Sequence, residues 1–237
     1  ETPTETETES ETETEETTEE ETEGPGDPVD REKVETHLII ASDTHYMSPS
    51  MTDYGAAFDS LVNSNDGKVI RYQPQLWQAF KSEVLAANPD ALILSGDLSL
   101  NGEKANHLEF AEKLREIEEA GVPVYVIPGN HDINKPDAGE YFGDQRTDVE
   151  SVTSEEFREI YADFGYNEAK SGAPDSLSYL VELNDTTWLM MLDTTVCEPE
   201  NEVYGEIKEG TLEWMEECLK EAYAEGITVI PVGHHNL

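Results

Sequence analysis

The sequence VYVIPGNHD, at residues 124–132, decides how the rest of the chain is interpreted. Four residues that favour β-strands lead into Pro-Gly, and Asn130, His131 and Asp132 follow directly. An amide oxygen can bind a metal ion, an imidazole can move a proton, and a carboxylate can orient that imidazole. The stretch therefore predicts a strand whose carboxyl end carries reactive groups.

Four other hydrophobic runs end in the same way. They lie at residues 37–42, 92–95, 188–192 and 228–232. The polar groups that follow them are Asp43-Thr44-His45, Gly96-Asp97, Asp193 and Gly233-His234-His235. In open α/β sheets ligands bind at the carboxyl ends of the strands, so we expect all five ends to share one site.

Helical patterns alternate with these strands and predict an α/β fold. Leu76, Leu108 and Leu212 belong to the apolar stripes that we expect to be buried. We also expect two neighbouring strands, at 177–183 and 186–192. The helices are expected at residues 74–88, 104–120 and 211–224, with a fourth that begins at the capping box Thr153-x-x-Glu156 and ends before Gly165.

Two long polar stretches, residues 46–72 and 133–152, interrupt this alternation. Loops of such length inside a domain are usually functional, so we expect both to cover the pocket, the second without a role in the core. Their basic residues Arg71, Lys135 and Arg146 are candidate phosphate contacts, with ordinary surface residues as the alternative.

The residues at the strand ends form a plausible set of metal ligands. Asp43 and His45 are two positions apart, so in extended backbone their side chains project to the same side. The carboxylate of Asp97 can give one oxygen to each of two ions, Asn130 offers an amide oxygen, and His234 adds an imidazole. A mixed N/O set without thiolate suits two divalent or trivalent ions of Mn, Fe, Zn or Co.

Each motif also has a simpler explanation. Asp-x-His pairs are common, Asn-His-Asp after Pro-Gly is compatible with a turn, and His234-His235 is compatible with an exposed terminus. The conjunction favours a site, because every group follows a hydrophobic strand. His37 and His107 lie outside this pattern and are interpreted as structural.

Charge is extreme and unevenly distributed. The 237 residues carry a formal charge of −40, and residues 1–36 hold 16 acidic and 2 basic residues. Residues 1–23 consist of Glu, Thr, Ser and one Pro, which cannot bury enough apolar surface to fold. We therefore expect a disordered acidic tether at 1–36 and a folded domain at 37–237. The acidic balance argues against nucleic acid as a non-enzymatic binding partner, because binding a phosphate backbone needs a basic surface.

The tether is typical of spacers that follow an export signal or a lipid anchor. We expect an exported or surface-attached protein, with a cytoplasmic or salt-adapted protein as the alternative. No apolar run reaches the roughly 18 residues that a membrane span needs. Cys197 and Cys218 are too few for a disulfide framework, and whether they pair stays open, although Cys218 fits a helical core position.

In their order, Asp43-x-His45, Gly96-Asp97, Gly129-Asn130-His131-Asp132 and the strand ending in His234 resemble the motifs of the calcineurin-like metallophosphoesterases. The resemblance covers residues 37–237 and implies a four-layer α/β/β/α sandwich with a dinuclear metal site. It also implies that Asp43 and His45 bind the first ion, that Asp97 bridges, and that Asn130 and His234 bind the second. By the same resemblance His131 donates a proton to the leaving oxygen and Asp132 steadies His131.

The same resemblance predicts a further Gly-His-x-His motif, which does not occur before Leu237, so we expect the sequence to be incomplete at its C-terminus. The expected function is metal-dependent hydrolysis of phosphate mono- or diesters, in which a metal-bound hydroxide attacks phosphorus. A dinuclear hydrolase for a different bond and a non-catalytic cell-surface binding module are the alternatives.

Overall fold

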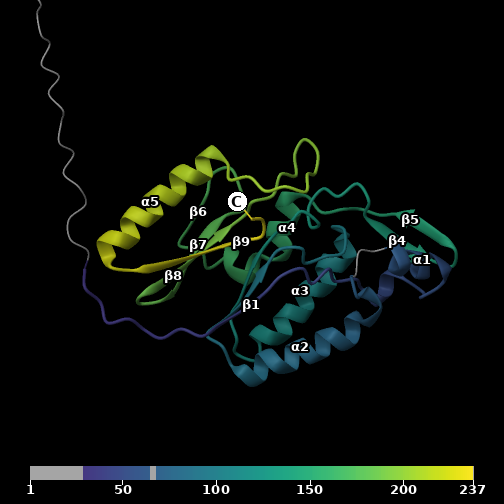
Figure 1. Ribbon diagram of the computed structural model, residues 1–237, viewed down its shortest axis with the longest axis horizontal. Coiled ribbons are helices and arrows are strands. Elements are labelled where there is room, and N and C mark those ends of the chain that lie inside the picture. The colour runs from purple at the N-terminus through teal and green to yellow at the C-terminus, as the bar shows by residue number, and fades with distance from the viewer. Residues whose placement is uncertain (1–28, 65–67, 237) are drawn as a thin grey trace, which may run out of the picture.

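The first half of the chain builds a parallel sheet. The computed structural model describes residues 29–64 and 68–236. Strands β1 (Leu38–Ala41), β2 (Ala91–Ser95) and β3 (Val124–Ile127) pair in the order β1-β2-β3. The central strand β2 is buried along its whole length, as a continuous apolar run in a parallel sheet requires. Helix α2 (Gln73–Ala87) connects β1 to β2, and α3 (Lys104–Glu118) connects β2 to β3, which confirms the expected alternation (Figure 1).

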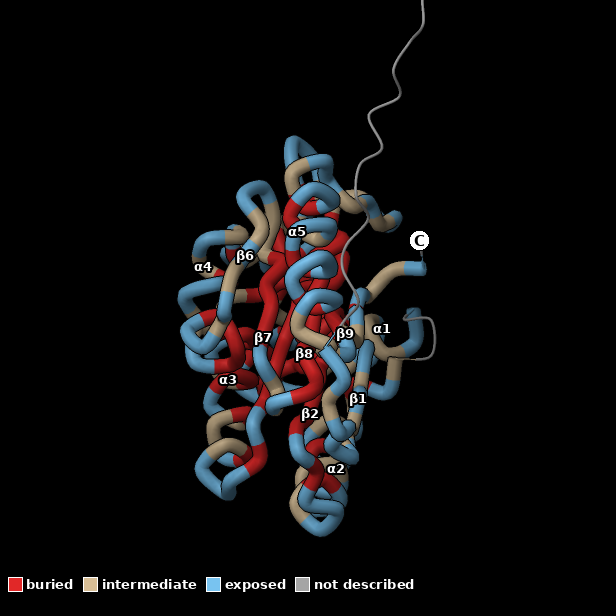
Figure 2. Tube along the Cα trace, turned by 90° about the vertical axis from the view of Figure 1, so that its left-hand side faces the viewer, coloured by how far each residue is buried: buried red, intermediate tan, exposed pale blue. Residues whose placement is uncertain are grey.

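The second half builds a four-stranded sheet. Its antiparallel part contains the two neighbouring strands expected around 177–192, and β9 is parallel to β8. Helix α5 (Glu209–Glu225) makes the crossover from β8 to β9 and lies on one face of this sheet (Figure 2). The strands are β6 (Ser171–Gly172), β7 (Tyr179–Asn184), β8 (Thr187–Leu192) and β9 (Thr228–Gly233).

Side chains of β7 and β8 alternate between two hydrophobic cores, as the period of a strand dictates. Val181 and Leu189 pack in the core that contains Leu92 of β2 and Val126 of β3. Their neighbours Leu180, Trp188 and Met190 pack with Trp214, Cys218 and Ala222 of α5. The two sheets therefore share one core, and α5 covers the outer face of the second sheet.

The fourth helix begins as the sequence predicts. In α4 (Ser154–Ile160) the Thr153 side chain accepts from the Glu156 backbone N–H, and the Glu156 side chain accepts from the Thr153 N–H. The chain then continues as a π-helical turn, η3 (Ala162–Tyr166), in which Gly165 has a φ of 108°. Only glycine adopts this backbone conformation readily.

The two long polar stretches are more regular than predicted. Residues 46–72 contain α1 (Ala56–Ser64) and the 3₁₀ turns η1 (Pro49–Met51) and η2 (Ile70–Tyr72). Residues 133–152 form a hairpin of β4 (Gly139–Phe142) and β5 (Gln145–Asp148). The prediction that the second stretch has no core role is wrong, because Ile133, Ala138, Tyr141 and Val152 are buried.

The two stretches pack on each other. Phe58 of α1 and Tyr141 of β4 share a small hydrophobic core, and the Ala57 N–H donates to the Gly143 carbonyl at 2.9 Å. Apolar residues that are dispersed among polar ones, such as Met51 and Ile70, supply the rest of this core. Together the stretches therefore form one unit beside the parallel sheet.

The predicted helix bounds agree with the structure, and much of each predicted stripe is buried, for example Val84, Leu114 and Ala222, but the first leucine of each stripe is not. Leu76, Leu108 and Leu212 are about half exposed, at 48, 50 and 51%. Next to these leucines, Trp77 of α2, Phe110 of α3 and Trp214 of α5 are buried. A large aromatic ring buries more apolar area than a leucine, so each helix is rotated to bury its aromatic residue.

The chain contacts the domain before residue 37. Arg31 Nε donates to the Glu225 carbonyl at 2.5 Å, and Lys33 Nζ donates to the Gly226 carbonyl at 3.0 Å. This part of the expected tether therefore lies along the end of α5. The prediction of disorder for residues 1–28 lies outside the described residues.

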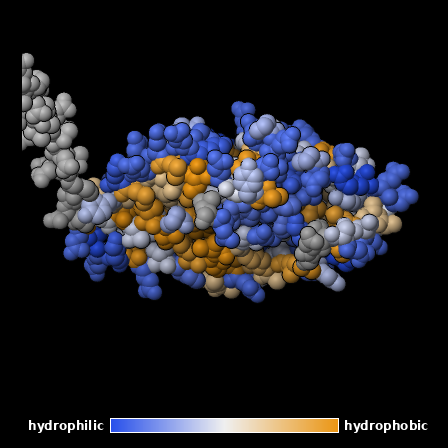
Figure 3. All heavy atoms as spheres, turned by 45° about the horizontal axis from the view of Figure 1, so that its top comes forward, coloured by the Kyte–Doolittle hydropathy of each residue, from blue (hydrophilic) through white to orange (hydrophobic). Residues whose placement is uncertain are grey.

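Cys197 and Cys218 are both buried and free, so the two do not pair. Cys218 lies in the core under α5, as its helical pattern predicts. Within residues 29–64 and 68–236, no helix has the length and apolar character that crossing a membrane demands. Hydrophilic side chains cover much of the surface in Figure 3, and apolar ones gather in a band on the side where the chain enters the fold.

Candidate metal centre

The loops after β1 and β2 lie against each other at the carboxyl edge of the first sheet. The Asp43 N–H donates to the Gly96 carbonyl at 3.1 Å, and the His45 N–H donates to the Asp97 carbonyl at 2.9 Å. Asp43, His45 and Asp97 have positive φ angles of 56, 42 and 52°. The first two are therefore not in the extended conformation that we expected. Backbone strain of this kind clusters at functional sites.

Asp43, His45 and Asp97 nevertheless converge. Their ligand atoms all lie within 4.8 Å of one another. His45 Nε2 is 3.7 Å from Asp43 Oδ1 and 3.6 Å from Asp97 Oδ2. Asp43 is exposed, whereas His45 and Asp97 are buried. Burial, followed by the charge of Lys68, lowers the pKa of His45 to about 4, so its imidazole is neutral and ready to bind a cation.

His234 reaches the other oxygen of the same carboxylate. It follows β9 in the second sheet, and its Nε2 lies 3.4 Å from Asp97 Oδ1. Its Nδ1 lies 2.8 Å from the Ser95 carbonyl, to which it donates, so the ring is held with Nε2 toward Asp97. Metal-binding histidines are oriented by a second hydrogen bond of this kind. Asp97 therefore presents one oxygen to each imidazole.

Asp97 and His234 form an ion pair. Burial opposes both charges and is the largest single effect, but the hydrogen bond and the charge attraction between the two side chains, together with backbone hydrogen bonds, outweigh it. Together these interactions lower the pKa of Asp97 to about 2 and raise the pKa of His234 to about 9. A cation bound between them would displace the proton on His234, because a metal ligand must be deprotonated.

Two glycines allow these loops to approach each other. A Cβ on Gly129 would lie 2.3 Å from both the nitrogen and Oδ1 of Asp97. A Cβ on Gly96, whose φ is +94°, would lie 2.7 Å from the ring of His234. The Gly-Asp and Gly-Asn-His-Asp motifs therefore contain glycine because a side chain would occupy the space of the ligands.

Asn130 is held at the end of β3, where the sequence predicts it. It is 9% exposed, and its backbone carbonyl accepts a hydrogen bond from Asn201 Nδ2 at 3.0 Å. Asn201 also donates to the Ile133 carbonyl at 2.8 Å and so fixes the loop on both sides of His131. These contacts fix the backbone of Asn130 beside His131.

His131 lies beside the converging carboxylates. Its ring centroid is 4.9 Å from that of His45, and its backbone N–H donates to Asp97 Oδ1 at 2.9 Å. Its Nδ1 faces two acceptors, the Leu100 carbonyl at 2.9 Å and Asn101 Oδ1 at 2.8 Å. Nδ1 therefore carries a hydrogen. Burial lowers the pKa of His131, and the charges of Lys68 and Lys135 act in the same direction. The charge of Asp97 acts in the opposite direction.

Asp132 differs from the prediction. Its carboxylate accepts hydrogen bonds from the backbone N–H groups of Leu98, Ser99 and Gly129 at 2.8–3.0 Å, and does not orient the His131 ring. A short carboxylate in a tight loop binds the nearest backbone donors. Asp132 therefore ties the loop after β3 to the loop after β2, and the ring of His131 is oriented by Asn101 and Leu100.

His107 keeps its structural interpretation. It is fully buried on α3, with Nδ1 2.8 Å from the Tyr161 hydroxyl and Nε2 3.0 Å from the Asp132 carbonyl. Burial lowers the pKa of His107 to about 4. The neutral imidazole of His107 thus supports the loop that carries His131 through the Asp132 carbonyl.

The fifth strand end does not join the site. Asp193, after β8, accepts from the Leu177 N–H and from the backbone and side chain of Thr195, at 2.7–2.9 Å. These contacts hold its carboxylate in its own turn. Asp193 therefore has a structural role in place of the predicted one.

The three basic residues that the sequence offers as phosphate contacts differ in their surroundings. Arg71 is paired with Asp59 at 2.5 Å, and Arg146 with Asp148 at the same distance, both at the surface. Lys135 has a side chain that is 11% exposed and a charge that acts on His131. The sequence reasoning missed Lys68, whose Nζ lies 3.4 Å from His131 Nε2. No motif marks Lys68, because only the packing of residues 46–72 brings it here.

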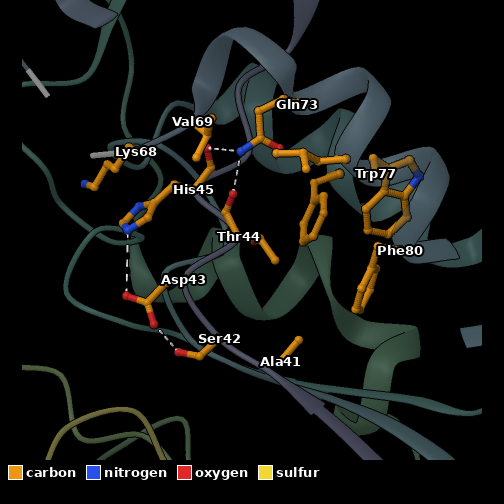
Figure 4. A pocket seen from close by; sticks show the side chains of 12 residues that line it. Ala41, Ser42, Asp43, Thr44, His45, Lys68, Val69, Gln73, Trp77 and Phe80 are labelled. Atoms are coloured by element: carbon orange, nitrogen blue, oxygen red, sulfur yellow. Dashed lines mark hydrogen bonds and ion pairs between the residues drawn. The ribbon is translucent and has the colours of Figure 1, made fainter. Parts of the chain in front are cut away.

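A groove of about 660 Å³ opens beside these residues. Asp43, His45 and Lys68 line its polar end, and Trp77 and Phe80 line its apolar end (Figure 4). Gln73 of α2 donates to the Thr44 carbonyl at 2.7 Å and to the His45 carbonyl at 3.2 Å, which fixes the loop between the two ends. Of the candidate ligands, Asp43 and His45 therefore face the groove.

The side chains present fit a pair of metal ions. Asp97 offers an oxygen on each side, His45 and His234 offer an imidazole on opposite sides of it, and Asp43 adds an exposed carboxylate. The set combines oxygen and nitrogen ligands without a thiolate, which suits Mn, Fe, Zn or Co. Its ligands come from both sheets.

The fold and this set of side chains are those of a metal-binding α/β protein. The family model of the calcineurin-like phosphoesterases matches residues 36–237, so the chain belongs to this family. A comparison with curated proteins found no match.

Proposed function

We propose that this protein hydrolyses phosphate mono- or diesters at a dinuclear metal site. One observation carries the proposal: the two oxygens of Asp97 face two different imidazoles, His45 at 3.6 Å and His234 at 3.4 Å. A buried carboxylate shared in this way suits two neighbouring cations. Membership of the calcineurin-like phosphoesterases supports the reaction class.

The residues that would hold the ions are Asp43, His45 and Asp97 on one side and Asp97, Asn130 and His234 on the other. Bound metal ions would supply a nucleophile at neutral pH and neutralise charge on phosphorus oxygens. The fold is, in this proposal, a four-layer α/β/β/α sandwich. Its layers are α2 with α3, the first sheet, the second sheet and α5.

His131 is the proton donor in this proposal. Its Nδ1 hydrogen is held by Leu100 and Asn101, so only Nε2 can exchange a proton with a substrate. A protonated Nε2 delivers its proton to the oxygen that leaves phosphorus, which lowers the barrier most for poor leaving groups. Asp132 contributes by fixing the loops, through its three backbone hydrogen bonds.

The proposal is tested with p-nitrophenyl phosphate and its bis-ester, with Mn²⁺ added to the chain. Asp97→Asn should lower metal content and reduce turnover by at least about 100-fold, because second-shell changes alone cost 10- to 100-fold. Asp144→Asn, at an exposed position of the β4–β5 turn, is the matched control. Tight metal binding without turnover of either ester would favour the binding-module alternative. Normal metal content and rate in Asp97→Asn would refute the bridging role.

A further inference from the structure

Lys68 directs its ammonium group at the proposed proton donor. The segment before η2 places Nζ 3.4 Å from His131 Nε2. Because Nδ1 of His131 faces two oxygen acceptors, Nε2 of the neutral ring has the free lone pair and accepts from Lys68; the same atom donates a proton to the leaving oxygen only after it is protonated. Figure 4 shows Lys68 beside His45 at the polar end of the groove. A substrate oxygen that approaches His131 Nε2 therefore also approaches a cation.

A second lysine lies near the same loop. Lys135 Nζ is 3.4 Å from Asn201 Oδ1 and 3.9 Å from Asp137 Oδ1, and its side chain is 11% exposed. Asn201 in turn donates to the Asn130 carbonyl. Lys135 is thus connected, through one side chain, to the loop that carries Asn130 and His131.

The chain has 14 basic against 54 acidic residues, so carboxylate partners for a lysine are plentiful. Several lysines form close pairs with carboxylates, such as Lys81 with Glu116 at 2.6 Å, whereas Lys135 has only a 3.9 Å contact with Asp137. Within the described residues, no carboxylate oxygen lies within 4 Å of Lys68 Nζ. Burial lowers the pKa of Lys68, which means that its charged form is destabilised until an anion lies beside it.

Two phosphate classes differ in how much they gain from such cations. A phosphate monoester carries about −1.5 to −2 charges at pH 7, because its second pKa is about 6. A diester carries a single charge, and an organic group replaces one of its anionic oxygens. Additional cations near the reacting phosphate therefore stabilise a bound monoester more than a bound diester.

We infer that Lys68, assisted by Lys135, binds the phosphate group of the substrate and makes the site selective for phosphate monoesters. The inference rests on the proposed function, since it assigns a substrate class to the same site. Each of the two long polar stretches supplies one of the lysines. This gives the packing of residues 46–72 against residues 133–152 a role in substrate choice.

A binding experiment tests the inference without turnover. Inorganic phosphate and dimethyl phosphate are titrated calorimetrically into the Mn²⁺-loaded chain at pH 8. Inorganic phosphate should bind more tightly, and Lys68→Gln should weaken it by about 10- to 100-fold, the loss expected for one charged hydrogen bond. Dimethyl phosphate should lose less, and Lys135→Gln should show the same pattern with a smaller loss.

Lys220→Gln is the matched control, because Lys220 is paired with Glu216 on the exposed face of α5. Lys68→Arg keeps the charge and should keep most of the phosphate affinity, and metal content reports on the integrity of each variant. Phosphate affinity in Lys68→Gln equal to that of the unchanged chain would overturn the inference.

Turnover separates this inference from the function on which it rests. The ratio of kcat/KM for p-nitrophenyl phosphate to that for its bis-ester should exceed one and fall in Lys68→Gln. A chain that prefers the bis-ester is still a phosphoesterase, but the inference is then wrong. If neither ester is hydrolysed but Lys68→Gln still lowers the phosphate affinity, the catalytic proposal is wrong. The phosphate-binding role of Lys68 is then retained.

Discussion

Gly129 has no room for a side chain in the metal centre. A Cβ on Gly129 would be 2.3 Å from Asp97 Oδ1 and 2.9 Å from the ring of His234. Nothing flexible lies in that direction, because Asp97 is held by its own backbone and by His131. An added methyl group must therefore separate the two loops.

Gly129→Ala should disrupt the site more than the fold. We expect Mn²⁺ affinity to fall by at least about 10-fold, and stability to fall by the roughly 1–3 kcal/mol typical of overpacking. Calorimetric Mn²⁺ titration and thermal unfolding measure the two effects. Gly172→Ala in β6 is the control, since a Cβ there would have an ordinary 3.4 Å contact with the Ser178 carbonyl. Unchanged Mn²⁺ affinity in Gly129→Ala would show that the loops do not meet as described.

Individual residues could be predicted where a motif fixes both the residue and its place on a strand end. Asp43, His45, Asp97 and His234 are such cases, and the structure brings their side chains together. Lys68 could not be found, because its position depends on how residues 46–72 fold. The contacts of Asp132, Asn101 and Asn201 likewise depend on which loop backbones lie close together, and the sequence does not show this.

Among the elements, strands were predicted more accurately than helix faces. A strand buried on both faces, such as β2, is a continuous apolar run and leaves no choice of side. A helix has several faces with similar spacing, and α5 has apolar residues on two of them. The stripe with Trp214 and Cys218 is buried, whereas Leu212 and Leu219 of the predicted stripe are about half exposed and Ala222 of the same stripe is buried. The partner surface decides between them.

The end of α3 provides a pH-dependent test at this scale. Burial, with Glu168 and Asp163 acting in the same direction, raises the pKa of Glu118 from 4.5 to about 7, against the Val124 N–H that donates to it. The folded chain thus binds this proton more tightly than the unfolded chain. The Glu118 carboxyl therefore lowers stability as the pH rises from 4.5 through about 7.

Glu118→Gln should accordingly raise the melting temperature at pH 8 and change it little near pH 4.5. The amide oxygen can still accept from the Val124 N–H, so the junction between α3 and β3 is preserved. Glu119→Gln, an exposed neighbour, is the control for the general loss of charge. A gain of equal size at both pH values would contradict the assignment.

At the scale of the whole molecule, the site depends on the docking of two sheets. Asp97 and His131 follow strands of the first sheet, and His234 follows β9 of the second. Tyr179 of β7 crosses between them: its hydroxyl donates to the Val126 carbonyl at 2.8 Å and accepts from the Val126 N–H at 3.2 Å. Because β3 is the edge strand, Tyr179 satisfies backbone groups that have no neighbouring strand.

Tyr179→Phe tests this docking without opening a cavity, because the ring remains and only the hydroxyl is lost. It leaves the Val126 N–H and carbonyl buried without the Tyr179 partner, which should cost about 1–3 kcal/mol. For a domain of this size that cost corresponds to a fall in melting temperature of roughly 2–12 °C.

Tyr223→Phe, on the exposed face of α5 at 44% exposure, should leave the melting temperature unchanged. Mn²⁺ affinity should fall less in Tyr179→Phe than in Gly129→Ala, since the ligand loops keep their own hydrogen bonds. If both tyrosine variants melt at the temperature of the unchanged chain, the edge of β3 is not held by the second sheet in this way.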